Sequence, residues 1–406
     1  MNLIAVCAAA QTEHSRERVA LGNLLQRAEA TRSDVVIVYA DGKRIAEYHS
    51  DKKVGALPLM SCTKSIVALV VGQAIAEGKI KGLDQAVADY YPEWRQGHKR
   101  SITIRQLLNH TSGIQQEGVA DIYGAPDSVQ LALAAELTSE PGNQFSYNNK
   151  AVNLLSGIIQ RATGQPLDVY ADSHLFKPMG IVNWKWLKDD AGTPRAMADL
   201  MMLGEDFAKF GQLVLDNGAW EGRPLVPATW IEELTRRSQP YEPSYGLLWW
   251  RLFDHVEATL DESKLVALGK DGCSVRFVEQ LRVLKGKTYR SLAEWRWALA
   301  AALGPSWEEL IRGELGLFGD LKIPSWSYGQ PDGVCARGSL GQYLVVLPPF
   351  RVVAVRQLRP FKEYDATRDR FDDFPDRIRE LASTLAWTPK KDERGALPQP
   401  TPDPQQ

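Results

Sequence analysis

Strand-like segments stand at both ends of this 406-residue chain, and the segments between them are mostly helical in pattern. Near the N-terminus, Val35–Tyr39 is an apolar, β-branched run, and Arg44–Tyr48 follows it after an Asp-Gly turn. Two more strands are predicted at Gln342–Leu347 and Val352–Gln357. Pairing in one sheet would bury the apolar faces of all four strands. The sequence therefore predicts an α+β fold, with a mixed, mainly antiparallel sheet flanked by helices and a helical lobe inserted between its two halves.

The chain divides into a leader, one folded unit and a tail. Residues 1–13 form the leader, 14–388 the folded unit, and 389–406 a tail rich in proline and charge that we expect to be disordered. Within the folded unit, a helical lobe covers about 75–240 and an additional helical insertion covers about 255–326. The leader has the apolar core and small-residue exit of an export signal but lacks the basic start. It favours an exported or periplasmic protein, with a cytoplasmic one as the alternative.

Composition excludes several classes of function. The formal net charge of −2 provides no basic stripe for nucleic acid. The longest apolar stretch, Ile66–Ala76, is interrupted by Gly72 and Gln73 and is well short of the ~20 residues of a membrane span. The four cysteines are too few and too scattered for a disulfide scaffold or a paired zinc site. We therefore predict no nucleic-acid partner, no membrane span, no metal and no cofactor.

The first segment that indicates chemistry is Leu59–Ser65, which precedes the apolar run Ile66–Val71. Ser61 and Lys64 stand three apart, and residues i and i+3 share one face of a helix. The spacing therefore places an amine beside a hydroxyl. A serine gives up its proton as it attacks, and a lysine can accept that proton only in its neutral form. Because a free lysine titrates near ~10.4, the motif predicts an enclosed Lys64.

The same spacing also has structural interpretations. A second Ser-x-x-Lys copy at Ser50–Lys53 lies in a charged stretch without apolar periodicity, which is typical of a solvated turn. A serine that opens a helix, as Ser61 does, is usually an N-cap. Taken alone, the pair favours the N-cap, so the catalytic interpretation depends on segments further along the chain.

Two later segments carry polar residues of the kinds that active sites use. Ile102–Gly113 is predicted to be a helix that ends at its glycine. His110 in this segment is either a general base or, as we prefer, a residue that braces the turn. In the second segment, Tyr147 and Asn149 precede an apolar helix. Standing alone, they would be interpreted as a core aromatic and a helix cap.

In their order along the chain, the motifs resemble those of the serine β-lactamase and penicillin-binding-protein superfamily, specifically its class C-like branch, which includes many esterases. The resemblance covers most of residues 20–360. The matching segments are Ser61-Cys62-Thr63-Lys64, Ile102–Gly113 with its His-Thr-Ser-Gly ending, Tyr147-Asn148-Asn149, Tyr245-Gly246-Leu247 and Gly338-Ser339-Leu340-Gly341-Gln342. Each segment is common by itself, but five in this order favour a catalytic Ser61 and a β-lactamase/transpeptidase-like fold.

The resemblance implies an acyl-enzyme mechanism on Ser61. Lys64 would act as the base, and Tyr147 would pass a proton to the leaving group and assist deacylation. Asn149 would donate its amide to the acyl-group carbonyl and help to fix Lys64. The oxyanion would lie between the backbone N–H groups of Ser61 and Ser339, and each such donor typically stabilises the transition state by ~3–4 kcal/mol.

The third family motif departs from its usual form. The Lys-Thr-Gly or His-x-Gly of the family stands here as Ala336-Arg337-Gly338, so the cation at the first position is missing. In members that process β-lactams or peptides, this segment helps to hold the substrate carboxylate. Adjacent side chains on a strand point to opposite faces, so Arg337 does not automatically replace that cation. Arg337 and Gly338 stay candidate substrate-binding residues, and the departure favours an esterase or amidase that acts on small acyl substrates.

The insertion 255–326 is the second departure. Helices are predicted inside it at about Leu292–Leu303 and Trp307–Leu315. Four tryptophans of the insertion either line an apolar substrate entrance or bury the inserted helices on the main body: Trp295, Trp297, Trp307 and Trp326. We favour burial because aromatic residues mostly serve packing.

Three functions are consistent with these motifs. Our prediction is a serine hydrolase that cleaves an ester or amide of a small acyl substrate. The first alternative is a β-lactamase or D,D-peptidase with the same site, and the second is a catalytically silent relative that binds a ligand. The complete set of Ser61, Lys64 and Tyr147 argues against the silent relative. No Gly-x-Ser-x-Gly elbow is present, which disfavours an α/β-hydrolase, and the oligomeric state is not specified by the sequence.

Overall fold

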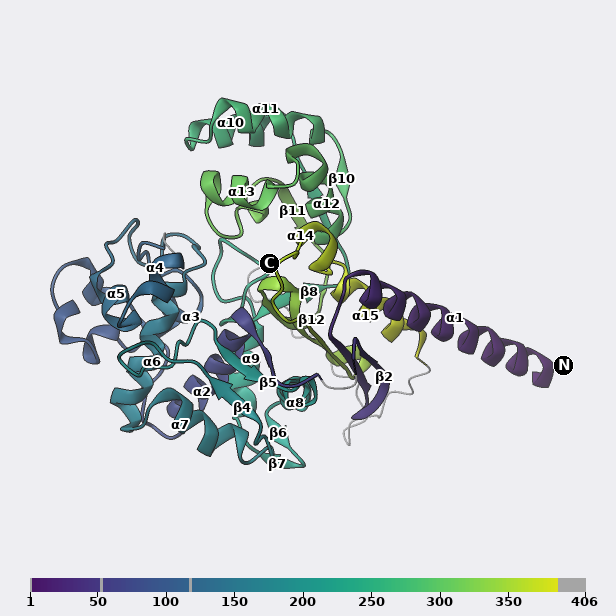
Figure 1. Cartoon of the computed structure of the whole chain (residues 1–406), viewed down its shortest axis with the longest axis horizontal. Coiled ribbons are helices and arrows are strands. Elements are labelled where there is room, and N and C mark those ends of the chain that lie inside the picture. The colour runs from purple at the N-terminus through teal and green to yellow at the C-terminus, as the bar shows by residue number, and fades with distance from the viewer. Residues whose placement is uncertain (1, 52–53, 117–118, 386–406) are drawn as a thin grey trace.

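The computed structural model describes residues 2–51, 54–116 and 119–385. A central sheet, a helical lobe on one side and a second lobe inserted at the end of the sheet make up the molecule (Figure 1). The predicted tail 389–406 lies outside the described residues. Among the described residues, no helix is both long and apolar enough to cross a membrane.

The central sheet has six strands, and every neighbouring pair is antiparallel. In spatial order the strands are β2 (Lys43–His49), β1 (Val35–Ala40), β14 (Val352–Gln357), β13 (Gln342–Leu347), β12 (Pro331–Gly338) and β8 (Trp250–Phe253). β1 pairs with β14, with Ile37 opposite Val355. The two ends of the chain therefore share one sheet, and the predicted fold class is confirmed.

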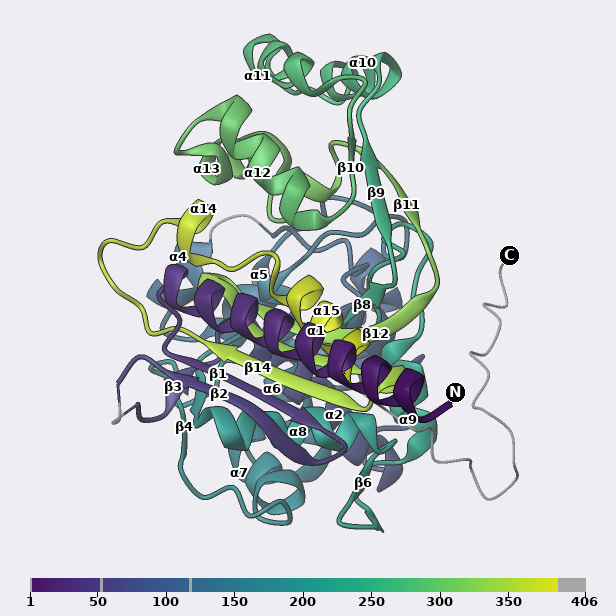
Figure 2. The same ribbon diagram turned by 90° about the vertical axis from the view of Figure 1, so that its right-hand side faces the viewer.

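Helices cover both faces of this sheet. α1 (Asn2–Ala30) and α15 (Phe374–Thr384) lie side by side on one face (Figure 2). α8 (Gly204–Leu215) packs on the other face against β1, β13 and β14. α1 includes the helix predicted from residue 14, and the assignment of residues 1–13 as a leader stays a prediction.

The helical lobe surrounds α2 (Thr63–Ala76), in which every residue from Thr63 to Ala74 is buried. A helix that is apolar on all sides belongs in a core. The lobe's other helices are α3 (Ile104–Leu108), α4 (Val119–Gly124), α5 (Ser128–Ala134), α6 (Asn149–Thr163), α7 (Leu167–Ala171) and α9 (Ala228–Thr235). Its short strands are β3 (Leu57–Pro58), β4 (Trp184–Trp186), β5 (Leu200–Met202), β6 (Ala219–Trp220) and β7 (Arg223–Pro224).

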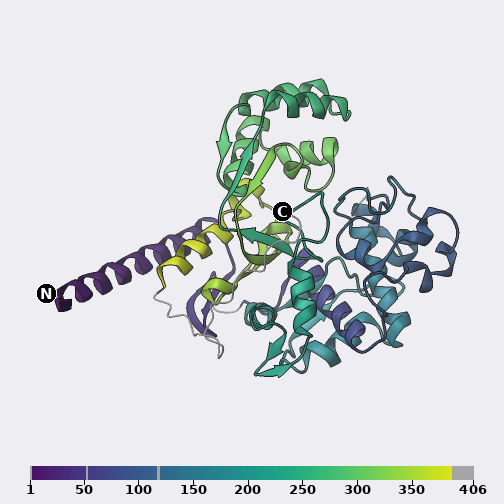
Figure 3. The same ribbon diagram turned by 180° about the vertical axis from the view of Figure 1, so that it is seen from behind.

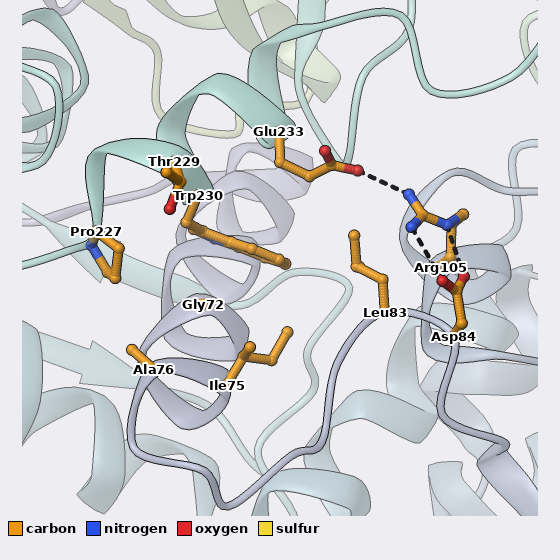
Figure 4. A pocket seen from close by; sticks show the side chains of 10 residues that line it. All are labelled: Gly72, Ile75, Ala76, Leu83, Asp84, Arg105, Pro227, Thr229, Trp230 and Glu233. Atoms are coloured by element: carbon orange, nitrogen blue, oxygen red, sulfur yellow. Dashed lines mark hydrogen bonds and ion pairs between the residues drawn. The ribbon is translucent and has the colours of Figure 1, made fainter.

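A cavity of about 390 Å³ lies beside the C-terminal half of α2 (Figure 4). Trp230 covers Gly72 there and donates a hydrogen bond from Nε1 to the Ala68 carbonyl at 3.0 Å. The glycine is required because a Cβ atom at this position would overlap the indole ring. At ~1.5 Å per residue, Gly72 is about 17 Å along the chain axis from Ser61, so this cavity is separate from the predicted site.

The insertion forms a lobe with its own core, seen at the top of Figures 1 and 3. It consists of β9 (Val256–Thr259), α10 (Glu262–Lys270), α11 (Val275–Leu281), β10 (Thr288–Tyr289), α12 (Leu292–Leu303), α13 (Trp307–Leu315) and β11 (Ser325–Tyr328), and α14 (Ala366–Asp369) follows later in the chain. Trp295 and Trp307 belong to the lobe's own core, and Trp326 packs against it. These rings therefore serve packing, but within the insertion, whereas we expected them to bury its helices on the main body. Trp297 is partly exposed, with the Arg27 guanidinium above its ring.

Three local predictions were wrong. The helix expected over Ile102–Gly113 ends at Leu108, because His110 takes a left-handed backbone (φ 59°) that an α-helix does not accommodate. The strand expected over Tyr245–Trp250 begins only at Trp250, after a turn in which Leu248 is left-handed. The helix expected from Met197 begins at Gly204, because Leu200–Met202 pairs with neighbouring strands as β5.

Candidate active site

Ser61 lies in a short 3₁₀ turn, Met60–Cys62, that leads directly into α2. The N-cap of α2 is Cys62, whose side chain makes no cap hydrogen bond, so Ser61 does not have the structural role of an N-cap. Met60, immediately before Ser61, has a left-handed backbone (φ 49°). Such conformations are uncommon for non-glycine residues and concentrate at functional sites, where the surrounding structure maintains the strain.

Lys64 lies one helical turn after Ser61, with its Nζ atom 2.9 Å from the Ser61 Oγ atom. Nζ also donates a hydrogen bond to the Met197 carbonyl oxygen at 2.6 Å. The Met197 N–H in turn donates to Oδ1 of Asn153 on α6 at 3.0 Å. The helical lobe therefore fixes the amine in position against the serine hydroxyl.

Burial determines the charge state of this amine. Lys64 is only 2% exposed, and desolvation lowers its pKa to about 7. Cys62 and Asp199 act in the opposite direction and raise the pKa. A large fraction of Lys64 is therefore neutral near pH 7, and at 2.9 Å the Ser61 hydroxyl can donate to a neutral amine.

Tyr147 completes a cluster with these two residues. Burial raises the pKa of the Tyr147 phenol, and a hydrogen bond with the Ser61 side chain opposes that rise. The Lys64 Nζ atom lies 5.1 Å from the centre of the Tyr147 ring. The phenol is therefore protonated at neutral pH and can donate a proton beside Ser61. The structure brings Ser61, Lys64 and Tyr147 together as predicted.

His110 braces the segment that carries Tyr147, which was the preferred interpretation of this residue. Its Nδ1 atom accepts a hydrogen bond from the Asn148 N–H at 3.0 Å, and its carbonyl accepts one from the Ser146 N–H at 2.8 Å. The ring centres of His110 and Tyr147 are 4.3 Å apart. Burial lowers the pKa of His110 well below its usual value, so the ring is neutral with its proton on Nε2.

We expect His110→Ala to lose about 2 kcal/mol more unfolding free energy than His110→Asn. Asparagine places Oδ1 where Nδ1 accepts from Asn148, and it tolerates the left-handed backbone. Alanine leaves that buried N–H without an acceptor, at a cost of about 1–3 kcal/mol, and adds backbone strain. Urea unfolding of the two variants measures the difference, and equal losses would show that ring packing alone explains the role of His110.

The end of β12 lies against the turn that carries Ser61. A Cβ atom on Gly338 would lie 2.7 Å from the Leu59 carbonyl oxygen and 3.0 Å from Met60 Cβ, so only glycine permits this approach. Ser339 follows directly after the strand. Ala336 is buried on the sheet face that packs on the helical lobe, and no cation occupies this first position of the motif.

Arg337 points to the opposite face of the sheet. Its Nε atom donates to Cys335 Sγ at 3.3 Å, and its guanidinium lies 5.2 Å from the centre of the Trp250 ring. It lines a small cavity together with Arg379 and Trp326, away from Ser61. The structure therefore does not bring Arg337 to the nucleophile, which is the consequence expected when adjacent strand residues alternate in direction.

The residue that caps α6 is Asn148, not Asn149 as the structural interpretation of this segment expected. Asn148 Oδ1 accepts from the Ala151 N–H at 2.8 Å and thereby caps α6. Asn149 is the first residue of this helix and is buried. Its Oδ1 atom has no hydrogen-bond partner within the described parts of the chain. Within the part of the chain that the structure describes, the Lys64 amine hydrogen-bonds to Ser61 and Met197, so the structure provides no support for Asn149 as the residue that fixes Lys64.

Two contributors to the site were missed by reasoning from the sequence. The Met197 carbonyl is a backbone group, which any residue supplies and no motif marks. Phe318 belongs to the insertion, and its ring centre lies 4.6 Å from that of Tyr147. The only sequence signal for it was the departure from the family's usual length at 255–326.

Known proteins share the family and the fold of this chain. The model of the Beta-lactamase family matches residues 21–356. The chain belongs to this family. Esterase EstB of Burkholderia gladioli is 34% identical over 144 residues, which cover 30% of this chain and 36% of that esterase. The chain spans about a third of the length of the curated relatives it matches.

Solved structures show the same fold. EstCE1, described as a hydrolase with promiscuous acyltransferase activity, aligns with a TM-score of 0.58 and 15% identity over 91% of this chain and 98% of that one. The octameric penicillin-binding protein homologue from Pyrococcus abyssi aligns with a TM-score of 0.56 and 16% identity over 90% of this chain and 76% of that one. At these identities, the likeness concerns the fold.

Proposed function

We propose that this protein is a serine hydrolase that cleaves an ester or amide of a small acyl substrate through an acyl-enzyme on Ser61. The observation that carries the proposal is the 2.9 Å separation between Ser61 Oγ and a buried Lys64 amine whose pKa is about 7. Few structural roles require a buried lysine whose amine contacts neither solvent nor a carboxylate. An amine of this kind is suited to act as the base for a serine nucleophile.

In the proposed acylation step, Ser61 Oγ forms a bond to the acyl carbon while Lys64 takes the hydroxyl proton. The carbonyl oxygen becomes an oxyanion between the N–H groups of Ser61 and Ser339, a role supported by the contact of Gly338 with the Ser61 turn. The bond to the leaving oxygen or nitrogen then breaks, and Tyr147 gives it a proton. Lys64 returns its proton to Tyr147, which restores both groups.

Deacylation follows the same steps with water in place of the serine. Water attacks the acyl carbon, its proton passes to the Tyr147 and Lys64 pair, and Ser61 Oγ leaves with a proton. The products are a carboxylic acid and the free enzyme. We assign Asn149 to donate from Nδ2 to the acyl-group carbonyl, because its buried side chain lies at the start of α6, two residues from Tyr147.

Two features support small acyl substrates without a carboxylate beside the scissile bond. Ala336 leaves the first position of the third motif without a cation, and Arg337 is turned to the opposite face of the sheet. The relative EstB is named an esterase, which agrees with an ester substrate for this chain.

A panel of p-nitrophenyl butyrate, a butyramide, nitrocefin and a D-Ala-D-Ala peptide tests the proposal on the wild-type protein. We expect turnover of the ester, and at a lower rate of the amide, with little on the lactam or the peptide. Preference for nitrocefin or the peptide would replace the esterase assignment by the β-lactamase or D,D-peptidase alternative. No turnover and no labelling by a fluorophosphonate would favour the catalytically silent alternative.

We expect Tyr147→Phe to lower kcat/KM by about 10²–10⁴-fold for ethyl butyrate and by much less for p-nitrophenyl butyrate. The variant removes the proton donor but keeps the ring that packs between His110 and Trp250. Ethoxide must be protonated as it leaves, whereas p-nitrophenolate leaves readily as an anion. Steady-state kinetics on both esters measure the difference. Equal losses on the two esters would contradict the role of Tyr147 as proton donor.

A further inference from the structure

The inserted lobe reaches the candidate active site through the turn after α13. Phe318 lies in this turn, and its ring centre is 4.6 Å from that of Tyr147 and 5.0 Å from that of Trp250. Gly316 lies beside Gln116 of the helical lobe, where a Cβ atom would be 4.0 Å from Gln116 Oε1. α13 lies on the side of the inserted lobe that faces the helical lobe (Figures 1 and 3). The turn therefore spans from the sheet to the helical lobe next to Tyr147.

Phe318 differs in exposure from the other rings around Tyr147. Four rings contact Tyr147 among the described residues: His110, Tyr245, Trp250 and Phe318. The first three are at most 2% exposed, whereas Phe318 is half-buried. Ser61 is also half-buried, so part of this residue is exposed. Of these rings, Phe318 is therefore the one with the largest exposed apolar surface beside Tyr147.

The turn holds Phe318 in a strained and anchored position. Its backbone is left-handed (φ 55°), which is unfavourable for a bulky residue. Asp320, two residues later, accepts a hydrogen bond from Arg296 Nε at 2.7 Å, and Arg296 Nη1 donates to Asp372 at 2.7 Å. All three charged residues of this network are buried. Strain that a buried network maintains is typical of positions that contact a ligand.

We infer that Phe318 determines specificity for the leaving group and selects esters or amides with an apolar, preferably aromatic, alcohol or amine part. This inference rests on the proposed function, in which Tyr147 gives its proton to the leaving atom. Atoms beyond that atom must extend past the Tyr147 hydroxyl, and the half-buried Phe318 ring packs beside the Tyr147 ring. An apolar leaving group therefore packs on Phe318, whereas the acyl group lies on the far side of the carbonyl carbon.

The test uses butyrate esters of methanol, cyclohexylmethanol, benzyl alcohol and 2-naphthylmethanol, whose alcohols ionise at similar pH. We expect the wild type to prefer the naphthylmethyl ester over the methyl ester in kcat/KM, and Phe318→Ala to reduce that preference about tenfold, within the range for one apolar contact. Phe318→Gly is the second variant, because glycine accepts the left-handed backbone and keeps the turn if alanine disturbs it. Trp297→Ala removes a partly exposed aromatic ring elsewhere on the same lobe and serves as the matched control.

A second series of methyl esters with acids of increasing size should give the same selectivity in the wild type and both variants. The breakdown rate of the butyryl-enzyme should also be unchanged, because the leaving group has already departed. Equal losses on methyl and naphthylmethyl esters, or a change in acyl selectivity, would overturn the inference while turnover still required Ser61. If turnover did not require Ser61, the proposed function would fail instead.

Discussion

Ser61→Ala is expected to lower kcat/KM on p-nitrophenyl butyrate by about 10⁴-fold or more. The variant removes the atom that forms the acyl bond, and the remaining groups have no other nucleophile at this position. The change deletes one oxygen from a half-buried position, so unfolding should be nearly unaffected. Steady-state hydrolysis of the purified variant, corrected for the rate without protein, measures the loss.

The second Ser-x-x-Lys copy provides a matched control for this experiment. Ser50 donates a hydrogen bond from its hydroxyl to Asp34 Oδ1 at 2.8 Å and lies outside the cluster around Tyr147. We expect Ser50→Ala to keep activity within about twofold, as is usual for a surface substitution away from a special feature. If both serine variants kept full activity, Ser61 would not be the nucleophile.

The second large effect concerns Lys64. Lys64→Met keeps the length of the side chain in its buried position but removes the base, and we expect a loss of about 10²–10⁴-fold in kcat/KM. In the wild type, kcat/KM should rise about tenfold between pH 6 and pH 8 and then level off. The sign follows from the pKa of about 7: raising the pH through 7 converts the charged amine to the neutral form that accepts the Ser61 proton.

Lys64→Met should lose this pH dependence together with the activity. Comparing pH profiles for the two proteins on one ester separates the base from a purely structural lysine. A wild-type profile that stays level from pH 6 to pH 8, or a Lys64→Met variant with the wild-type profile, would contradict the assignment of Lys64 as the base.

Much of the fold could be predicted because its main signals are local. Strand periodicity and an Asp-Gly turn predicted β1 and β2, and the helices at Leu292–Leu303 and Trp307–Leu315 match α12 and α13 at both ends. The errors fall where tertiary contacts override local pattern. His110 interrupts its predicted helix because the left-handed backbone lets its ring reach the Asn148 N–H.

Some groups of the candidate site could likewise be predicted from the sequence, and others could not. Ser61 and Lys64 could be predicted from their side-chain chemistry and their spacing, and Tyr147 from the resemblance of its segment to a family motif. The role of the Met197 carbonyl could not be predicted, because the position of a backbone acceptor is set by the path of the chain and not by the residue type. Phe318 could not either, because only the packing of the inserted lobe places it against Tyr147.

The most direct test of the central claim is intact-protein and peptide mass spectrometry after brief exposure to p-nitrophenyl butyrate and acid quenching. We expect one added butyryl group on the peptide that contains Ser61, present in the wild type and absent from Ser61→Ala. A butyryl group on a different residue, or rapid turnover with an equally active Ser61→Ala variant and no adduct, would contradict the account.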